Sequence, residues 1–517
     1  MVFIYHRLFR PHITDFENVP KLFRDFFFKL NKKFSPFNKN ILKLSEPKYP
    51  IIKSSYPGPK MKNLLNDLEI CNPNYLSIKS FINYEKSTGN YFRDCDGNMF
   101  LDFSNSGNNN ILGYNSAKIF ESYLKNENLF HKNFVNKSHG FNNYLNTDIV
   151  YTLEKFMSEV KPSAMEKVLF NKSPEQLAFL LSMVRRGKIQ SENLKSLNIN
   201  YENNFINNNQ NEFSRLMLPQ TNFSEKIFFE KFKILKITPN SNTSLNSNYS
   251  LNFSDNSLYK YSPFPSLKYP LKENMKENYS LESKCLEEAE KILKEKFDVS
   301  AILIEAVAEG EKWATPKFFS KLRKLACLYN ADFIVDERKS GLTVGRIWQH
   351  ELWNLHLPPD FVLFGNKLLN SGLFVREEAL PDKVYNFYCD FNNVDFNNLA
   401  VLGSLMGICN EKDLFAKSEK AGEYFKLRLK DINKKIGLFK DIRGKGSLIA
   451  FDILDARENE EHDLQRVVFD RFISYCKNSG IFVDGNKDTN TVFIRPNIIV
   501  ENRHYDVLLN TIEEFKI

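Results

Sequence analysis

The chain has 517 residues, of which 42% are hydrophobic and 26% are charged, so it can bury a substantial core and is not a wholly disordered protein. No apolar run reaches the length of about 20 residues that a helix needs to cross a membrane. The formal net charge is +8. Because the first 40 residues carry +5 of it, the remainder holds too little positive charge for a nucleic-acid-binding surface. The seven cysteines are scattered without a CxxC pair, which favours reduced thiols over a disulfide framework or a metal site.

The chain begins with a basic segment, residues 1–45, that is aromatic and short of acids. Mitochondrial transit peptides are basic, amphipathic and poor in acids, so this composition indicates a targeting segment. The segment is also rich in Phe and poor in Ser. An extension that is disordered or packs on the protein surface is therefore the alternative interpretation.

Two further segments are rich in Asn and low in complexity, near residues 190–213 and 240–258. Neither shows apolar periodicity, so burial cannot offset the conformational entropy that ordering them would cost. We predict that both are surface-loop insertions in a folded domain.

The first regular elements are a β-hairpin and a helix. Residues 89–103 alternate between apolar and polar around the turn Asp96-Gly97-Asn98, which predicts the hairpin. Residues 147–160 carry apolar side chains at helical spacing.

Residues 300–375 give the clearest pattern, since short buried-type strands alternate with a helix. Strands are predicted at 301–304, 332–335 and 361–364, and Thr315 with Pro316 begins a helix after the first of them. This order predicts a parallel α/β sheet, in which ligands bind beyond the carboxyl ends of the strands. The last part of the chain predicts a separate α+β unit, with helices at 467–477 and 504–515 and strands at 481–483 and 492–495.

Asp336 and Lys367 follow two of the predicted parallel strands, so we expect them at the same edge of the sheet. A lysine in a low-dielectric cleft can form a Schiff base with an aldehyde cofactor, and a carboxylate can hold the protonated ring nitrogen of pyridoxal phosphate (PLP). Taken alone, the pair is weak evidence, because a solvated lysine and a helix-capping aspartate would have the same spacing.

Several segments in order along the chain resemble the class III PLP-dependent aminotransferases, and most closely the 4-aminobutyrate aminotransferases among them. The resemblance begins near residue 47 and reaches the C-terminus. It is carried by GNYFRDCDGNMFLDF at 89–103, FPSLKYPLKENMKEN at 264–278, KCLEEAEKIL at 284–293, FFSKLRKLACLYNADFIVDE at 318–337, IWQHELW at 347–353, IRGKGSLIAFD at 442–452 and FIRPNIIVENRHYDVLLN at 493–510.

The resemblance implies an α/β protein of PLP-dependent transferase fold type I, with a large domain built on a mainly parallel sheet and a smaller α+β domain. It divides the chain into the leader at 1–45, an N-terminal part of the small domain at 46–140, a large domain at 141–395 that contains both Asn-rich inserts, and a C-terminal small domain at 396–517.

The resemblance also implies roles for individual residues. Lys367 stands at the position of the Schiff-base lysine and Asp336 at that of the aspartate facing the ring nitrogen. Glu305 and Glu309 resemble the acidic motif beside the substrate, and Arg495 the arginine that binds the substrate carboxylate or pairs with that motif. The remaining assignments are Ser173 at the phosphate, Phe223 stacking on the ring and Lys226 in place of a substrate-binding arginine.

Other positions depart from the family pattern. The Gly/Ser-rich phosphate cradle is replaced by Phe170-Asn171-Lys172-Ser173, which has no glycine and no cysteine for an iron–sulfur cluster. After the VDE motif, a small apolar residue and a glutamine become Arg338 and Lys339, and a guanidinium there could occupy the cofactor site. The threonine that reaches the phosphate from a partner subunit aligns near Phe387.

Two functions therefore remain open. The first is a PLP-dependent aminotransferase that moves an amino group from an ω-amino acid, such as 4-aminobutyrate, to 2-oxoglutarate. The second is a catalytically degenerate homologue that is kept as a structural or assembly subunit and binds other proteins. For either function the resemblance implies a homodimer and, together with the basic leader, a location in the mitochondrial matrix.

Overall fold

The computed structural model describes residues 45–71, 78–104, 110–117, 119, 148–196, 232–239, 258–295, 298–380, 394, 396–454 and 462–516. The leader up to residue 44, most of the two Asn-rich inserts, and Phe223, Lys226 and Phe387 lie outside these residues. No helix among the described residues is long and apolar enough to span a membrane.

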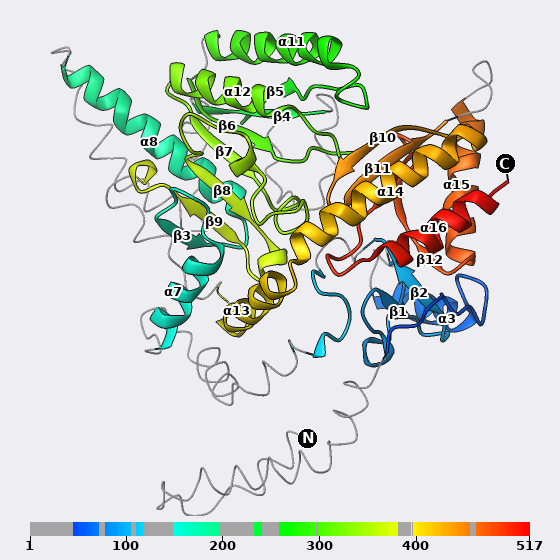
Figure 1. Cartoon of the computed structure of the whole chain (residues 1–517). Coiled ribbons are helices and arrows are strands. Elements are labelled where there is room, and N and C mark those ends of the chain that lie inside the picture. The colour runs from blue at the N-terminus through cyan, green and yellow to red at the C-terminus, as the bar shows by residue number, and fades with distance from the viewer. Residues whose placement is uncertain are drawn as a thin grey trace, which may run out of the picture.

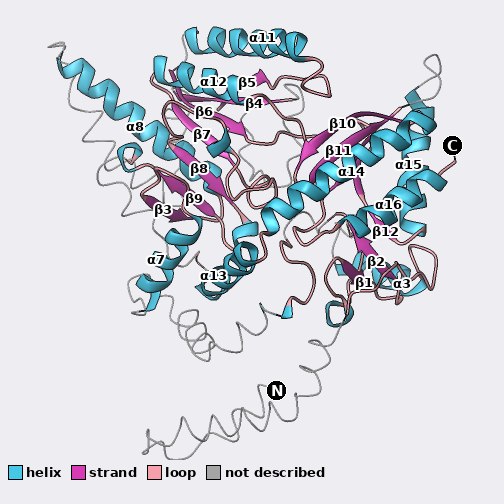
Figure 2. Ribbon diagram, in the orientation of Figure 1, coloured by secondary structure: helices cyan, strands magenta, loops and turns pink. Residues whose placement is uncertain are grey.

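The largest layer is a seven-stranded sheet (Figures 1 and 2). Its spatial order is β3 (Lys167–Phe170), β9 (Gly372–Val375), β8 (Phe361–Phe364), β7 (Asp332–Asp336), β6 (Asp298–Glu305), β4 (Phe232–Thr238) and β5 (Tyr259–Pro263). All neighbours are parallel except β9, which runs antiparallel to both β3 and β8. The sheet is mainly parallel, so the predicted α/β fold of type I is confirmed.

Helices cover both faces of this sheet, because its central strands bury side chains on both sides. In β6, Ala301 and Leu303 pack with residues of α8 (Pro174–Ser196) on one face. Ile302 and Ile304 alternate with them and pack on the other face with α11 (Met275–Lys294) and α12 (Pro316–Leu328). Figure 1 shows α8 on the opposite side of the strands from α11 and α12.

The start of α12 is fixed as predicted. Thr315 is its N-cap, and its Oγ1 accepts a hydrogen bond of 3.3 Å from the backbone N–H of Phe318. Pro316 takes the first helical position, where a missing N–H costs nothing. The carboxylate of Glu282 in α11 accepts hydrogen bonds from the Thr315 N–H at 2.7 Å and hydroxyl at 2.8 Å, which ties α11 to this end of α12.

The C-terminal part packs three helices on an antiparallel sheet. The strand order is β10 (Phe439–Lys445), β11 (Leu448–Ile453), β14 (Thr491–Ile494) and β13 (Asp484–Asn486). The helices α14 (Leu414–Ile436), α15 (His462–Asn478) and α16 (Asn502–Glu514) share one apolar core with these strands. The predicted helices and strands of this region are thereby confirmed.

The N-terminal hairpin belongs with this C-terminal part. It consists of β1 (Tyr91–Arg93) and β2 (Met99–Asp102), and β12 (Ile481–Phe482) pairs with β2 in parallel. Strand β12 of the C-terminal part thus pairs with residues some 380 positions earlier in the chain, within the segment 46–140 that the resemblance assigns to the same small domain. The remaining elements are α3 (Pro59–Cys71), α7 (Asp148–Val160), α13 (Phe396–Glu411), and the short 3-10 turns η2 (Tyr84–Lys86), η3 (His350–Leu352), η4 (Asn366–Leu368) and η5 (Glu377–Ala379).

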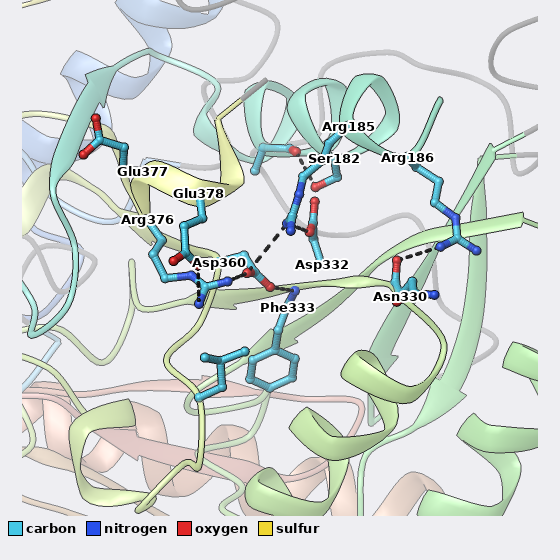
Figure 3. Close-up of polar contacts among 12 residues, drawn as sticks. Ser182, Arg185, Arg186, Asn330, Asp332, Phe333, Asp360, Arg376, Glu377 and Glu378 are labelled. Atoms are coloured by element: carbon cyan, nitrogen blue, oxygen red, sulfur yellow. Dashed lines mark hydrogen bonds and ion pairs between the residues drawn. The ribbon is translucent and has the colours of Figure 1, made fainter. Parts of the chain in front are cut away.

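A buried ion-pair network holds the amino ends of β7 and β8 together (Figure 3). Asp360 is at its centre, and its Oδ2 lies 2.8 Å from Arg323 Nη1 while its Oδ1 lies 2.6 Å from Arg376 Nη2. The same carboxylate accepts a hydrogen bond of 2.8 Å from the backbone N–H of Phe333 in β7. Arg185 of α8 pairs with Asp332 and approaches Asp360 to 3.8 Å.

Glu46 ties the first described residues to the C-terminal helix. Its carboxylate accepts hydrogen bonds from the backbone of Asn90 at 2.6 Å and from His504 Nε2 at 3.2 Å, and it also pairs with Arg503. The His504 Nδ1 accepts from the backbone N–H of Glu501, so Nε2 carries the ring proton. Burial alone would raise the pKa of Glu46, but His504 and Asn90 lower it to about 2.

We expect Glu46→Gln to remove a pH-dependent part of the stability. The pKa of Glu46 in the folded chain lies below its ordinary value, so its contribution is present above about pH 4.5 and is lost as the pH falls towards 2. At pH 7 the variant should lose about 1–2 kcal/mol after allowance for solvent screening. Thermal unfolding at pH 7 and pH 3 tests this, because the difference between the two proteins should shrink at the lower pH. An equal difference at both would contradict it.

Candidate functional site

Three ionisable residues lie at the carboxyl edge of the large sheet. Glu305 is the last residue of β6 and is paired in register with Asp336, the last residue of β7. Lys367 lies in η4, directly after β8. The parallel order of these strands places all three residues at the edge where ligands bind in such sheets.

The carboxylate of Asp336 is held by Arg338, two residues along the chain. Arg338 Nε lies 2.9 Å from Oδ1 and 3.0 Å from Oδ2 of Asp336, and its backbone N–H donates to Oδ1 at 3.0 Å. Arg338 Nη2 donates to Oδ2 as well. Burial alone would raise the pKa of Asp336, but the charge and hydrogen bonds of Arg338 lower it. Asp336 is therefore an ionised carboxylate with both oxygens engaged.

Lys367 has its own partners in the turn that follows β7. Its Nζ donates to the backbone carbonyl of Lys339 and lies 3.2 Å from Thr343 Oγ1. The residue is only 3% exposed. Burial lowers the pKa of Lys367 well below its ordinary value; Glu311 opposes this, and the nearby charges of Lys339 and Arg495 add to it. The amine therefore loses its proton more easily than an ordinary lysine, and it is directed towards backbone and hydroxyl oxygens.

The side chain of Arg338 lies along the backbone between β8 and η4. A Cβ atom built on Gly365 would be 3.3 Å from Cγ of Arg338. Arg338 therefore packs against the segment that carries Lys367 while its guanidinium holds Asp336.

The predicted phosphate turn lies between β3 and α8. The backbone N–H of Ser173 donates to Asn171 Oδ1 at 2.7 Å, and Pro174 has no N–H to offer. The first turn of α8 instead carries the acidic side chain of Glu175. An anion is stabilised at a helix start by free N–H groups, and here one is used, one is missing and a carboxylate is already present.

Glu175 is the second partner of Arg338. Its Oε2 lies 2.7 Å from Arg338 Nη2, and its Oε1 lies 3.5 Å from both Lys236 Nζ and the Tyr259 hydroxyl. Burial alone would lower the pKa of Lys236, but Glu175 and the neighbouring acids raise it overall. The start of α8 and the ends of β4, β5 and β7 are thus joined by one polar cluster.

A second ion-pair cluster joins the large sheet to the C-terminal sheet. Arg495, which follows β14, donates from Nε to Glu311 Oε1 at 2.6 Å. Lys339 Nζ lies 2.9 Å from Glu311 Oε2 and 3.1 Å from the carbonyl oxygen of Ala308. Glu311 is completely buried, yet Arg495 and Lys339 lower its pKa against the effect of burial.

The sequence suggests that Arg495 binds a substrate carboxylate or pairs with the acidic motif of Glu305 and Glu309; in the structure the acid that pairs with Arg495 is Glu311. The chain turns back between Ala308 and Lys312 with left-handed backbone at Gly310 and at Glu311, which directs Glu311 inward and leaves Glu309 exposed. Glu305 is half-buried beside Asp336, and burial together with that neighbour raises its pKa to about 7.

The sequence did not indicate Glu175, Lys236, Tyr259 or Glu311 as site residues. An acid in the first turn of a helix that begins with Pro174 is an ordinary helix signal, so Glu175 carried no mark of a special role. Phe223 and Lys226 lie outside the described residues. Among the residues that are described, no group of His, Cys, Asp and Glu could hold a metal ion.

A protein-family model, "Aminotransferase class-III", matches residues 240–515, which is more than half of the chain. The chain belongs to the class III aminotransferases. It is similar to the mitochondrial 4-aminobutyrate aminotransferases of Sus scrofa and Homo sapiens, at 27% and 28% identity, with 89% of this chain and 89% of each relative covered. Among solved structures it resembles a lysine aminotransferase from M. tuberculosis in the internal aldimine form, with a TM-score of 0.64 and 16% identity over 84% of this chain and 94% of that one.

The family implies PLP as cofactor, so the site can be compared with what PLP needs. The protonated ring nitrogen requires a carboxylate. Both oxygens of the expected one, Asp336, already accept hydrogen bonds from Arg338. The aldehyde requires a lysine. Lys367 is present, but its amine is hydrogen-bonded to the Lys339 carbonyl and the Thr343 hydroxyl. The ring-binding half of this class III site does not fit the cofactor.

The phosphate-binding half does not fit either. A phosphate at the start of α8 would meet the carboxylate of Glu175 and would find neither the N–H of Ser173 free nor one on Pro174. Glu175 is in turn held by Arg338 and Lys236. In the part of the chain that the structure describes, Arg338, Asp336, Glu175 and Lys236 are therefore paired with one another at the place where the family's cofactor would need space and charge.

Proposed function

We propose that this chain is a non-catalytic class III aminotransferase that serves as a structural or assembly subunit. The observation that supports this most directly is the contact of Arg338 with both oxygens of Asp336. In this proposal Asp336 stabilises the fold and no longer binds a ring.

Electrostatics also opposes the displacement of Arg338 from Asp336 by the cofactor. Two unit positive charges 4 Å apart repel by about 4 kcal/mol at an effective dielectric constant of about 20. A pyridinium brought to Asp336 would experience this repulsion from Arg338 and would also have to replace its hydrogen bonds to Asp336. Glu175 would repel the phosphate in the same way.

We also propose that this subunit is mitochondrial. The mammalian relatives of this chain are named mitochondrial proteins, and the first 40 residues carry most of the net positive charge. A subunit that has lost its chemistry would be kept for contacts with other proteins, and a homodimer would follow the family pattern. Size-exclusion chromatography with light scattering on the mitochondrial protein distinguishes a dimer from a larger complex.

An active enzyme is the second candidate, and the state of Lys367 favours it. Covalent chemistry with an aldehyde requires a deprotonated amine, and burial lowers the pKa of Lys367 at the family's Schiff-base position. In this alternative Arg338 leaves Asp336, Arg495 or Lys226 binds a carboxylate, and an ω-amino acid such as 4-aminobutyrate donates its amino group to 2-oxoglutarate.

The expected result for the purified full-length protein is that added PLP gives no absorbance band beyond that of free PLP and that no glutamate forms from 4-aminobutyrate and 2-oxoglutarate. Absorbance scans of the wild-type protein and of Lys367→Ala, with and without PLP, provide the measurement. The two proteins should give the same spectrum, because no Schiff base forms on Lys367. A band that is present in the wild type and absent from Lys367→Ala would reject the non-catalytic proposal in favour of the enzyme.

A further inference from the structure

Arg338 and Glu175, the two residues that occupy the places of the cofactor's ring and phosphate in the proposed function, form a hydrogen-bonded ion pair with each other. Arg338 Nη2 donates to Glu175 Oε2 at 2.7 Å, while Nε of the same guanidinium holds Asp336. Both residues are largely shielded, with 29% of the Arg338 side chain and 20% of the Glu175 side chain exposed. The pair therefore reaches from the start of α8 to the end of β7.

We propose that Arg338 and Glu175 form a built-in substitute for PLP. The guanidinium of Arg338 replaces the protonated ring on Asp336, and the carboxylate of Glu175 replaces the phosphate at the start of α8. This inference rests on the proposed non-catalytic function, and it adds which residues took over each part of the cofactor's charge.

The charges around the site show why a substitute is needed. Three carboxylates, Glu175, Glu305 and Asp336, converge at the carboxyl edge of β6 and β7 and the start of α8. Without Arg338, the acids at two adjacent strand ends would depend on Lys236 and Lys339 for compensation, and partly buried negative charge that is less well paired is costly. A bound pyridinium would supply a cation beside Asp336 in a PLP enzyme, and Arg338 supplies it permanently here.

Glu175 in turn compensates the cations that remain when no phosphate is bound. Lys236 of β4 lies 3.5 Å from the carboxylate of Glu175. Tyr259 directs its hydroxyl to the same carboxylate oxygen. The positive end of the α8 dipole also favours an anion at this place. The substitute therefore matches PLP in the sign of charge at both ends.

The double variant Arg338→Val/Glu175→Ser tests the proposal, because it removes both parts of the substitute. We expect it to bind PLP roughly tenfold more tightly than the wild-type protein or more, since the ring and phosphate sites are then free. The bound cofactor should give a visible absorbance band that disappears when Lys367→Ala is added. Arg346→Val, which removes an exposed arginine from the same connection, is the matched control and should leave PLP binding unchanged.

Thermal unfolding supplies a second readout that does not depend on the cofactor. Arg338→Met and Glu175→Gln should each lower the melting temperature. In the combined Arg338→Met/Glu175→Gln variant the loss should be smaller than the sum of the two single losses, because both substitutions remove the same ion pair. Additive losses together with a double variant that does not bind PLP would overturn the substitute. A wild-type protein that binds PLP through Lys367 would instead overturn the proposed function, so the two failures are distinguishable.

Discussion

Asp360→Asn is expected to lower the free energy of unfolding by about 3–5 kcal/mol, because it removes one partner from a buried set of ion pairs. The Asp360 side chain is 3% exposed, and it faces Arg323, which is 2% exposed, and Arg376. An amide has the same shape but no charge, so the buried Arg323 would lose its partner at Asp360 and Arg376 would keep only the exposed Glu378 as an ion-pair partner among the described residues. The loss would also weaken the link from Asp360 to the backbone of Phe333 (Figure 3).

The midpoint of thermal or denaturant unfolding measures this effect. Asp431→Asn is a suitable control, because Asp431 pairs with Lys434 at 2.9 Å but is 64% exposed on its side chain. A pair this exposed contributes little to stability, because solvent screens it. Equal shifts in the two variants would show that burial of the Asp360 network adds nothing to stability.

The position of this network explains why it was not recognised in the sequence. Arg323, Asp360 and Arg376 lie on α12, before β8 and after β9, so only the folded sheet brings them together. Charged residues at such spacing are usually solvated, and nothing local marks these as buried. The network lies at the amino edge of the strands, whereas the candidate site lies at the carboxyl edge.

The central part of the fold could be predicted because its signals are local. The strands β6, β7 and β8 are short buried runs, and α12 has both an N-cap and an apolar stripe, so each element is determined by its own residues. The antiparallel strand β9 was not predicted, because its direction depends on pairing with β3, about 200 residues earlier in the chain. The pairing of β12 with β2 is non-local in the same way.

The candidate site could be predicted only in part. The order of strands was enough to place Asp336 and Lys367 at one edge, and Arg338 beside Asp336 already suggested a competing cation. Glu175, the other acid that Arg338 contacts, could not be predicted as a site residue. Its contact with Arg338 spans 163 positions and depends on the packing of α8 against the sheet. Likewise, the inward direction of Glu311 depends on the left-handed backbone at Gly310 and Glu311.

Glu311→Gln is expected to cost about 3–5 kcal/mol and to loosen the contact between the two sheets. The carboxylate of Glu311 is fully buried and binds one cation from each side, Arg495 after β14 and Lys339 after β7. A glutamine amide can accept from one of them but turns an NH₂ group towards the other. One partly buried cation would therefore lose its charged partner at the junction.

The chain contains a matched control two residues away. Glu309 is an exposed carboxylate in the same loop, so Glu309→Gln should change the free energy of unfolding by no more than about 0.5 kcal/mol. Hydrogen exchange should show faster exchange in Glu311→Gln at the loop 306–313 and at the turn between β10 and β11. The strands on either side of that turn contact the loop. Leu448, which begins β11, shares an apolar cluster with Val307 and Trp313 of the loop, and Arg443 of β10 donates a hydrogen bond of 2.6 Å to the Gly310 carbonyl. If both variants melt and exchange alike, Glu311 does not hold the sheets together. A selective loss in Glu311→Gln would mean that Arg495, which the sequence led us to expect at a substrate carboxylate, acts here with Glu311 in a contact between the two sheets.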